Sequence, residues 1–151
     1  MRVVVDKATT RVFGEVWEIV VGLGLAFVLY AGMSFAFHTP VPLTAVVSDS
    51  MEPNYYKGDM LVVYGSSYGV GDVVVYENPR TSLPIVHRVV NVTDDGRFIT
   101  KGDNNPQDDV SSGITPAPVG EESVLGKSVL RVPYLGWIKI LFMRYVLGFK
   151  V

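Results

Sequence analysis

The chain has 151 residues, with 13 Lys and Arg, 15 Asp and Glu, and a formal net charge of −2 at pH 7. A charge so close to neutral gives no indication of nucleic acid or another strongly charged partner. The absence of cysteine excludes disulfides, thiolate metal sites and a cysteine nucleophile, and two histidines are too few for a histidine-based metal cage. The length fits one soluble domain together with a membrane anchor.

The N-terminal part contains an apolar run of membrane-spanning length. Residues 19–37 carry no charge, and as a helix they would rise about 28 Å, close to the hydrocarbon thickness of a bilayer. A secretory signal peptide is the first alternative, but its apolar core is normally shorter, and no clear Ala-x-Ala cleavage site follows. A buried core helix is the second alternative, and it would need a much larger protein around it. We predict a transmembrane helix over residues 16–38.

The charges that flank this segment predict its orientation. Arg2, Lys7 and Arg11 precede it, and no Lys or Arg follows until Lys57. By the positive-inside rule, residues 1–15 then lie in the cytoplasm and the domain after the helix lies on the extracytoplasmic or lumenal side. The sequence therefore predicts a single-pass membrane protein.

The C-terminal segment, residues 134–151, is also apolar, but Lys139 and Arg144 interrupt it. Burying these charges in a spanning helix is unfavourable by about 2.5–3.5 kcal/mol each. A helix lying in the interface would let both charges reach the headgroups while its apolar side chains enter the bilayer. We predict a membrane-associated segment of this kind, and a second span is the alternative.

Residues 39–133 are expected to form a mainly β domain. Short Val-rich runs separated by Gly, Pro, Asn and Asp predict strands, and Asp94-Asp95-Gly96 predicts a hairpin turn. The following loop, residues 103–121, is long for a compact domain, and such loops are usually functional or mobile. The expected strands are residues 44–47, 60–64, 72–76, 85–92, 97–101 and 123–132.

A hexamer shortly after the apolar run offers a candidate nucleophile. It reads Ser48-Asp49-Ser50-Met51-Glu52-Pro53. A serine hydroxyl becomes a good nucleophile only when a base such as His or Lys removes its proton. His87 lies in an apolar predicted strand, where a core histidine bonded to the backbone is the alternative role. His38 ends the membrane segment, and an interfacial position explains it more simply.

Acidic residues follow His87 about one predicted hairpin later. An imidazole base needs an acid that accepts a hydrogen bond from its other ring nitrogen. A hairpin return can bring Asp103, Asp108 or Asp109 back beside the strand that carries His87. The same loop faintly resembles a calcium site, but Asp108 stands where Gly is required and Ile114 where Glu is required. A solvated polar turn is the other alternative, and no metal or cofactor is predicted.

The order of these segments resembles the type I signal peptidases. The hexamer is similar to the S-x-S-M-x-P box of that family. Bacterial members use a Ser–Lys pair, whereas archaeal and endoplasmic-reticulum members have His at the position of that Lys. Because His87 stands there, the chain resembles the archaeal and endoplasmic-reticulum branch, over about residues 15–137. Four further segments agree in order: Lys57-Gly58-Asp59, Gly71-Asp72-Val73-Val74-Val75, His87-Arg88-Val89 and Lys101-Gly102-Asp103-Asn104-Asn105.

The resemblance implies a role for individual residues. Ser50 matches the nucleophile, His87 the general base, and Asp109 the catalytic acid that orients the imidazole. Asp103 matches a supporting acid that shapes the site. Ser48 matches the residue whose hydroxyl helps to hold the oxyanion, together with the backbone N–H of Ser50.

The chain departs from the family pattern at Asp49, where many relatives have Gly. A carboxylate at this position would oppose a developing oxyanion unless its side chain points away. Alternation along a strand would allow that orientation. The nucleophile assignment does not depend on it.

The resemblance further implies a membrane-bound serine endopeptidase that removes signal peptides from exported preproteins. Such an enzyme would work in an archaeal cell membrane or the endoplasmic-reticulum membrane, alone or with other subunits of a signal peptidase complex. Two other functions stay open at this point. One is a membrane-tethered β domain that binds a partner without catalysis, and the other is a related serine protease with a dedicated substrate or itself as substrate.

Overall fold

The structure is a computed structural model of the chain. It describes residues 7–78, 80–81 and 83–148. It divides into two units, Met1–Ala36 and Phe37–Val151. Arg2 and the outer ends of the segments predicted over residues 1–15 and 134–151 lie outside the described residues.

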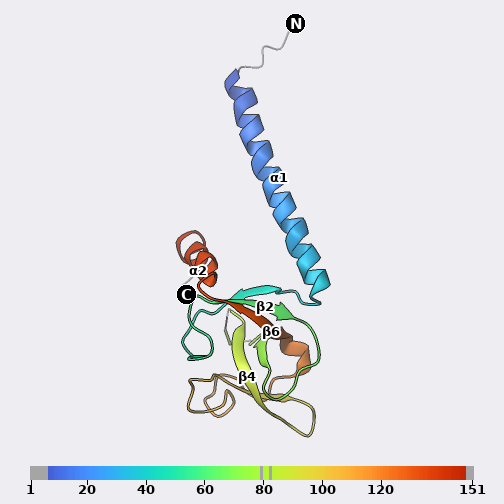
Figure 1. Ribbon diagram of the computed structural model, residues 1–151, viewed down its shortest axis with the longest axis vertical. Helices are drawn as coiled ribbons and strands as arrows, with labels where there is room; N and C mark the ends of the chain where they lie inside the picture. The colour runs from blue at the N-terminus through green and yellow to red at the C-terminus, as the bar shows by residue number, and fades with distance from the viewer. Residues whose placement is uncertain (1–6, 79, 82, 149–151) are drawn as a thin grey trace. The chain divides into compact units, whose positions relative to one another are not determined.

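The first unit consists of helix α1, Lys7–Ala36 (Figure 1). Within it, Val12–Ala36 is long and apolar enough to cross a membrane, with a mean hydropathy of 2.1 and no buried side chains. That exposure argues against a core helix, because a core helix must bury its apolar faces. The helix begins before the predicted residue 16, because hydropathy marks only its apolar part. It ends at Ala36, two residues before His38, whose backbone has a φ of 52° and so leaves the right-handed helical region.

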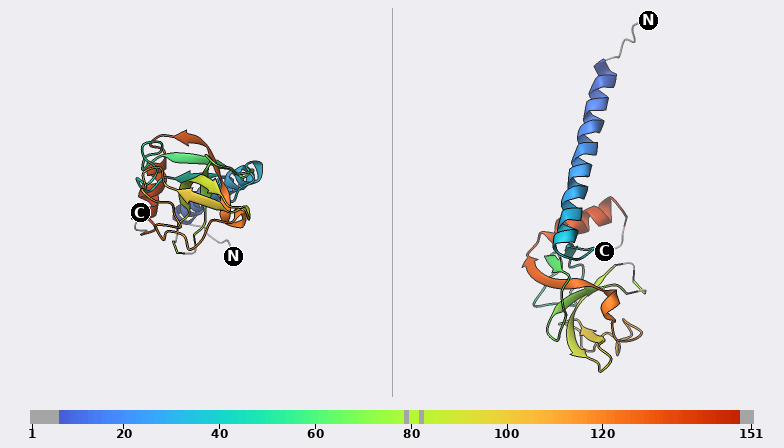
Figure 2. Two further views of the ribbon diagram at one scale, coloured as in Figure 1. Left: turned by 90° about the horizontal axis from the view of Figure 1, so that it is seen from below. Right: turned by 90° about the vertical axis from the view of Figure 1, so that its right-hand side faces the viewer.

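The second unit is built around a six-stranded antiparallel sheet with the order β1-β2-β6-β3-β4-β5 (Figures 1 and 2). This arrangement confirms the mainly β fold class predicted from the sequence. The strands are β1 (Leu43–Ala45), β2 (Met60–Tyr64), β3 (Val73–Tyr76), β4 (Ile85–Val92), β5 (Phe98–Lys101) and β6 (Val124–Val132), and a 3-10 turn, Glu121–Ser123, precedes β6.

The strand predictions are correct for β2 and β4 and differ by one or two residues at the ends of the others. The predicted hairpin turn lies between β4 and β5, where Gly96 has a φ of 80°. Glycine adopts this left-handed conformation without the steric penalty of a Cβ atom. The turn returns the chain along β4. It thereby brings the following loop, residues 103–121 with Asp103, Asp108 and Asp109 (the acidic loop), back toward His87.

Strand β3 lies between two apolar clusters, one on each face of the sheet. Its successive side chains point to opposite faces, so Val74 and Tyr76 enter one cluster and Val75 enters the other. All four residues of the strand are buried. The first cluster contains Val74, Tyr76, Val89, Phe98 and Val119, and the second contains Val46, Leu61, Val63 and Val75.

An ion pair between a buried carboxylate and a partly exposed guanidinium fixes the turn between β1 and β2. The Asp59 carboxylate accepts from the Tyr56 backbone N–H at 2.8 Å and from the Arg131 guanidinium at 3.1 Å. Arg131 reaches the turn from β6, where it lies opposite Leu61, and it also donates to the Asn54 carbonyl. The turn in turn holds the end of β1, because Val46 exchanges backbone hydrogen bonds with Gly58 and Asp59.

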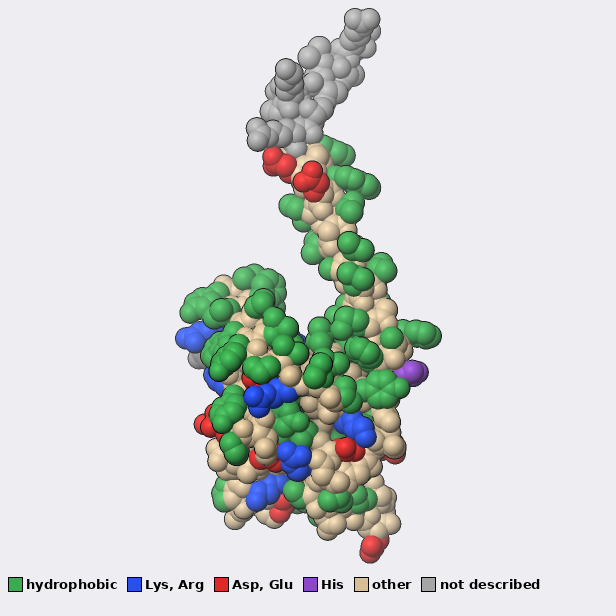
Figure 3. Space-filling model, in the orientation of Figure 1, with side chains coloured by type: hydrophobic (Ala, Val, Ile, Leu, Met, Phe, Trp, Pro, Cys, Tyr) green, Lys and Arg blue, Asp and Glu red, His purple; other side chains and the backbone are tan. Residues whose placement is uncertain are grey.

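The C-terminal segment contains helix α2, Gly136–Tyr145, which packs against β1 and β2. Gly136 and Ile140 are buried on its inner side, and Lys139 donates to the Leu43 carbonyl at 3.3 Å. Lys139 therefore faces the domain and does not reach outward as expected. Hydrophobic side chains gather over the outer side of α2 (Figure 3), with Ile138, Leu141, Phe142 and Tyr145 all exposed. Membrane association of this segment stays a prediction.

We expect Arg131→Met to lower the free energy of unfolding by about 1–3 kcal/mol, because it leaves the buried Asp59 carboxylate without its cation. The effect stays below that of a fully enclosed pair, since the Arg131 side chain is 32% exposed. Unfolding of the full chain in detergent, followed by circular dichroism, measures the change. Arg97→Met is the matched control, because its partner Asp95 is well exposed and the pair should contribute little. Equal stability of the two variants would contradict a structural role for the Asp59 pair.

Candidate active site

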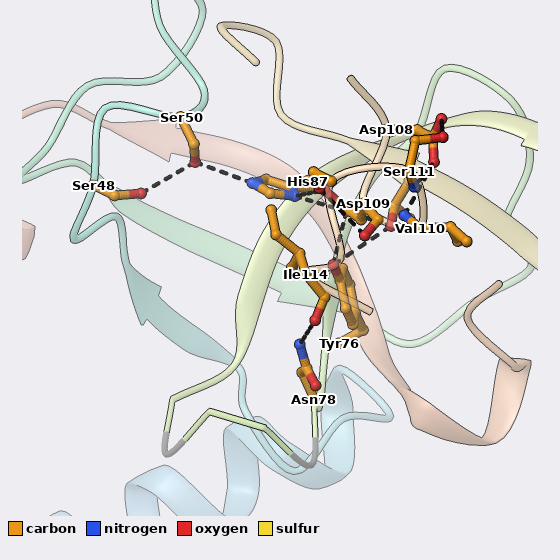
Figure 4. Close-up of polar contacts among 12 residues, drawn as sticks. Ser48, Ser50, Tyr76, Asn78, His87, Asp108, Asp109, Val110, Ser111 and Ile114 are labelled. Carbon is orange, nitrogen blue, oxygen red and sulfur yellow. Dashed lines mark hydrogen bonds and ion pairs between the residues drawn. The ribbon is translucent and has the colours of Figure 1, made fainter. Parts of the chain in front are cut away.

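Three side chains from distant parts of the second unit meet in one line of contacts (Figure 4). The Ser50 Oγ lies 3.1 Å from the His87 Nε2. The His87 Nδ1 lies 2.9 Å and 2.8 Å from the two carboxylate oxygens of Asp109. With Nδ1 donating to the carboxylate, Nε2 is free to accept the serine proton. This is the relative arrangement that a serine nucleophile, a base and an orienting acid require.

Ser50 stands in a turn beyond the end of β1. The next residue, Met51, is 1% exposed and anchors the turn in the domain, while Ser50 itself remains partly accessible. The Ser50 carbonyl accepts from the backbone N–H of Asn104 at 2.8 Å. The position of Ser50 is thereby fixed by the buried Met51 side chain and by the hydrogen bond from Asn104.

The contact with the acidic loop requires glycine at position 102. A Cβ atom on Gly102 would lie 2.6 Å from the Ser50 carbonyl oxygen and 2.7 Å from the Asn105 Nδ2. Such distances are far inside normal contact, and the first involves rigid backbone. The Lys101–Asn105 segment, one of those that carry the family resemblance, thus includes a residue whose small size permits the loop to contact the Ser50 backbone.

His87 is placed by the register of β4. It lies opposite Val74 of β3 and is 4% exposed. The alternative of a core histidine bonded only to the backbone does not describe it, because both ring nitrogens meet side chains. His38, in contrast, lies outside this site, with its ring edge-on to Tyr64.

Asp109 is completely buried and receives hydrogen bonds from two hydroxyls that the sequence analysis did not identify. Tyr76 donates to its Oδ2 at 2.8 Å and Thr100 donates to the same oxygen at 2.6 Å. Burial raises the pKa of Tyr76, which keeps its phenol protonated and able to donate. No sequence motif marks these two residues, since their role follows from strand register alone.

Asp103 joins Arg88, the neighbour of His87 on β4, to Asn54 in the segment that follows Ser50. The Arg88 guanidinium binds its two carboxylate oxygens at 2.8 Å and 2.7 Å, and Asn54 donates to it at 2.8 Å. The hydrogen bonds from Arg88 lower the pKa of Asp103 and keep it ionised. This geometry supports the supporting-acid role expected for Asp103, which stays a prediction.

Asp108 faces its own loop. Its carboxylate accepts from the backbone N–H groups of Val110 and Ser111 and from the Ser111 hydroxyl, which lowers the pKa of Asp108. Asp103 and Asp108, at the first and sixth positions of the calcium alternative, therefore already have other partners. Among the residues that the structure describes, no group of three His, Asp or Glu is arranged to hold a metal ion.

Ser48 and Asp49 differ in direction. The Ser48 Oγ lies 3.1 Å from the Ser50 Oγ, and both serines line a groove. Asp49 is exposed and outside the groove lining, while its carbonyl accepts from Asn104. The segment is a bend and not a strand, so turn geometry rather than strand alternation separates the two side chains.

The groove has a volume of about 580 Å³ and runs past Ser50 and His87. Its walls come from the end of β1, from the segment that leads into β4, and from the acidic loop. Because β1 and β4 are not neighbours in the sheet, the sheet must curve to bring both to one groove. The lining residues are Ala45, Val46, Val47, Ser48, Ser50, Met51, Thr81, Leu83, Pro84, Ile85, Val86, His87, Asn105 and Ile114.

Comparison with known proteins agrees with the resemblance. A family model described as signal peptidase, peptidase S26, matches residues 16–99, a range that includes Ser50 and His87 but ends before Asp103 and Asp109. "Signal peptidase complex catalytic subunit sec11" of Pyrenophora teres f. teres is 33% identical over 150 residues, covering 94% of this chain and 87% of that protein.

Two further relatives carry the same name. The protein of Schizosaccharomyces pombe is 34% identical over 158 residues, covering 87% of this chain and 82% of its own. The protein of Metarhizium robertsii is 35% identical over 131 residues, covering 82% of this chain and 76% of its own. With most of its length matched at this level, the chain belongs to the signal peptidase family, peptidase S26.

Proposed function

We propose that the chain is a membrane-bound serine endopeptidase that cleaves signal peptides from exported preproteins. The observation that carries the proposal is the line of contacts from the Ser50 Oγ through the His87 imidazole to the buried Asp109 carboxylate, at the edge of an open groove. The names of the relatives, signal peptidase catalytic subunits, support the substrate class.

The proposed reaction begins when the Ser50 Oγ attacks the scissile carbonyl carbon and its proton passes to the His87 Nε2. Asp109 accepts from Nδ1–H and stabilises the imidazolium that forms. When the tetrahedral intermediate collapses, the peptide C–N bond breaks and the imidazolium protonates the leaving amine. A water molecule then attacks the carbonyl carbon of the acyl-enzyme and gives one proton to the His87 Nε2. When this second tetrahedral intermediate collapses, the bond from the acyl carbon to the Ser50 Oγ breaks. The imidazolium returns its proton to the Ser50 Oγ, which restores the free hydroxyl.

The oxyanion that forms on the carbonyl needs donors within hydrogen-bond reach. We assign this role to the Ser50 backbone N–H and the Ser48 hydroxyl. Ser48 lines the groove and lies 3.1 Å from the attacking oxygen, which supports the assignment. The exposed position of Asp49 removes the main electrostatic objection to it, because its carboxylate is solvated and outside the groove.

The groove favours a substrate in extended conformation. Within the described sheet, β1 pairs only with β2, so its other edge faces the groove that its last residues line. A preprotein segment could add a strand there, and main-chain pairing of this kind tolerates varied sequences. By the family resemblance, the first and third residues before the cleaved bond would have small side chains.

We propose the domain arrangement predicted from the sequence: residues 1–15 cytoplasmic, 16–38 spanning the bilayer, 39–133 catalytic and outside, and 134–151 on the membrane. The apolar Val12–Ala36 helix supports the anchor, and the preceding positive charges support the orientation. The relatives, named as catalytic subunits of a signal peptidase complex, support partner subunits in the same membrane.

Helix α2 supports the proposed membrane-bound tail. The second unit begins at Phe37, directly after α1, and the Phe37 carbonyl accepts from Gly65 at the end of β2. The chain therefore enters this unit at the same β1–β2 edge against which α2 packs. A helix at that edge with an apolar outer side is suited to lie in the bilayer interface.

The Ser50→Ala variant should lose cleavage of a model preprotein, because the covalent route needs the nucleophile. Ser48→Ala should retain a rate reduced by about 10²–10³, the usual effect of losing one oxyanion donor. Single-turnover rates of the purified full-length variants in detergent measure both effects. Near-wild-type cleavage by both variants would contradict the assignment, and a wild-type protein that cleaves no preprotein would contradict the function.

The three aspartates should respond differently to replacement by asparagine. Asp109→Asn keeps the shape but favours the wrong imidazole tautomer, with an expected loss of about 10⁴ in kcat. Asp103→Asn weakens the link between Arg88 and Asn54, so it should lower both Tm and activity. Asp108→Asn should matter least. Full activity of Asp109→Asn combined with an inactive, thermally unchanged Asp103→Asn would show that the two roles are exchanged.

Trp137 can report the position of α2, because Trp17 is the only other tryptophan in the chain. In a Trp17→Phe background, lipids brominated near the headgroups should quench the Trp137 fluorescence more strongly than lipids brominated deep in the acyl chains. That result is expected for a helix lying in the interface. Stronger quenching by the deep label would indicate a span, and no quenching by either would place the helix away from the bilayer.

A further inference from the structure

Three neighbouring strands direct one polar side chain each toward the Asp109 carboxylate. On β4, His87 lies opposite Val74 of β3. Tyr76 follows Val74 by two residues and so shares its face of the sheet. On the other side, Thr100 of β5 lies opposite Val89, which shares the face of His87. The phenol, the imidazole and the threonine hydroxyl therefore form a row across β3, β4 and β5.

The acidic loop places a carboxylate over this row. The Asp109 backbone N–H donates to the Thr100 carbonyl at 2.8 Å, and its own carbonyl accepts from Thr115 at 2.9 Å. The Oδ2 atom of Asp109 then receives hydrogen bonds from both hydroxyls, at 2.8 Å from Tyr76 and 2.6 Å from Thr100. Tyr76, Thr100 and Asp109 are each at most 1% exposed, so water cannot take over these hydrogen bonds without opening the site.

We propose that Tyr76 and Thr100 are positioning residues for the reaction at Ser50 and His87. They fix the Asp109 carboxylate in the plane that the imidazole needs, and they disperse its negative charge so that it does not hold the imidazolium too tightly. The inference rests on the proposed function for its consequence in catalysis, but its effect on the imidazole can be measured without a substrate.

The charge on Asp109 determines in which direction the titration of His87 should move when a hydroxyl is removed. The Asp109 carboxylate accepts hydrogen bonds from two hydroxyls, and these bonds stabilise its charged form. A carboxylate stabilised in this way attracts the proton on Nδ1 less than a carboxylate without such hydrogen bonds. Removing one hydroxyl leaves more charge facing His87 and stabilises the imidazolium. The titration midpoint of His87 should rise, and the acidic limb of the activity profile, where the base becomes protonated, should move to higher pH.

The other charged groups around His87 do not change in this comparison. Asp103 is neutralised by Arg88 on the same strand as His87. Asp49 of the nucleophile turn is exposed, and Asp108 is occupied by its own loop. The Tyr76 and Thr100 hydroxyls both donate to Asp109 and lie 3.4 Å from each other. We therefore expect either residue to affect the imidazole through Asp109.

The test uses Tyr76→Phe and Thr100→Val, which remove one hydroxyl each with little change in shape, and Thr100→Ser, which keeps the hydroxyl. The imidazole signal is followed by NMR against pH in the full chain in detergent. The chain has two histidines, so a His38→Gln background leaves His87 alone. We expect the midpoint to rise by on the order of one pH unit in Tyr76→Phe and Thr100→Val and to return toward wild type in Thr100→Ser.

In the cleavage assay, Tyr76→Phe should lower kcat about tenfold with KM nearly unchanged, because a misplaced acid affects the reacting geometry more than binding. Its acidic limb should move with the NMR midpoint. Tyr68→Phe is the matched control, since Tyr68 packs against the same apolar cluster beside Phe98. That variant should leave the His87 midpoint and kcat unchanged.

An unmoved or lowered His87 midpoint in folded Tyr76→Phe would overturn the inference, even if Tm falls, because the hydroxyl would then be only structural. If Tyr76→Phe does not fold, the comparison of Thr100→Val with Thr100→Ser decides in the same way. Other results would contradict the proposed function: a wild-type protein that does not cleave preproteins, or a Ser50→Ala variant that still cleaves them. In either case the NMR titration would still test the effect of Tyr76 and Thr100 on His87.

Discussion

A buried carboxylate can exist in this domain only because donors surround it. Asp109 has no access to water, and a charge in that position is strongly unfavourable unless hydrogen bonds replace its hydration. The donors come from β3, β4 and β5, so the carboxylate depends on the register of three strands at once. A shift of one residue in β4 would turn His87 to the opposite face and leave the charge uncompensated. The site and the sheet are therefore stabilised by the same contacts.

Ser50 is positioned by a separate set of contacts at the other side of the curved sheet. Met51 anchors its turn, and the Asp59–Arg131 pair holds the chain that follows. The contacts around Asp109 and those around Ser50 meet where Gly102 allows the acidic loop to approach the Ser50 carbonyl. The distance from the Ser50 Oγ to the imidazole is consequently set by rigid backbone contacts on both sides, which suits a reaction that depends on pre-formed geometry.

The sequence predicted the parts of this arrangement that depend on local pattern. Val-rich runs and turn residues gave the strands, and the spacing of the motifs gave Ser50 and His87 by family resemblance. From residues alone, Asp103, Asp108 and Asp109 could not be distinguished, because side-chain direction in an irregular loop has no period. Tyr76 and Thr100 escaped prediction for a related reason. Their hydroxyls reach Asp109 only through pairing between strands, which a sequence does not state.

The Lys139 side chain points toward the sheet and not toward the membrane headgroups, because it bonds to a carbonyl of β1. A lysine in an apolar segment is expected to reach toward the headgroups. Here its ammonium instead binds the Leu43 carbonyl on β1, a strand with an open edge and carbonyls that need donors. The outer side of α2 is thereby left almost entirely apolar, with Arg144 as its cation. The chain runs from β1 to Ser48 and Ser50 within a few residues. The helix that carries this apolar surface is therefore also bonded to the strand that leads to Ser50.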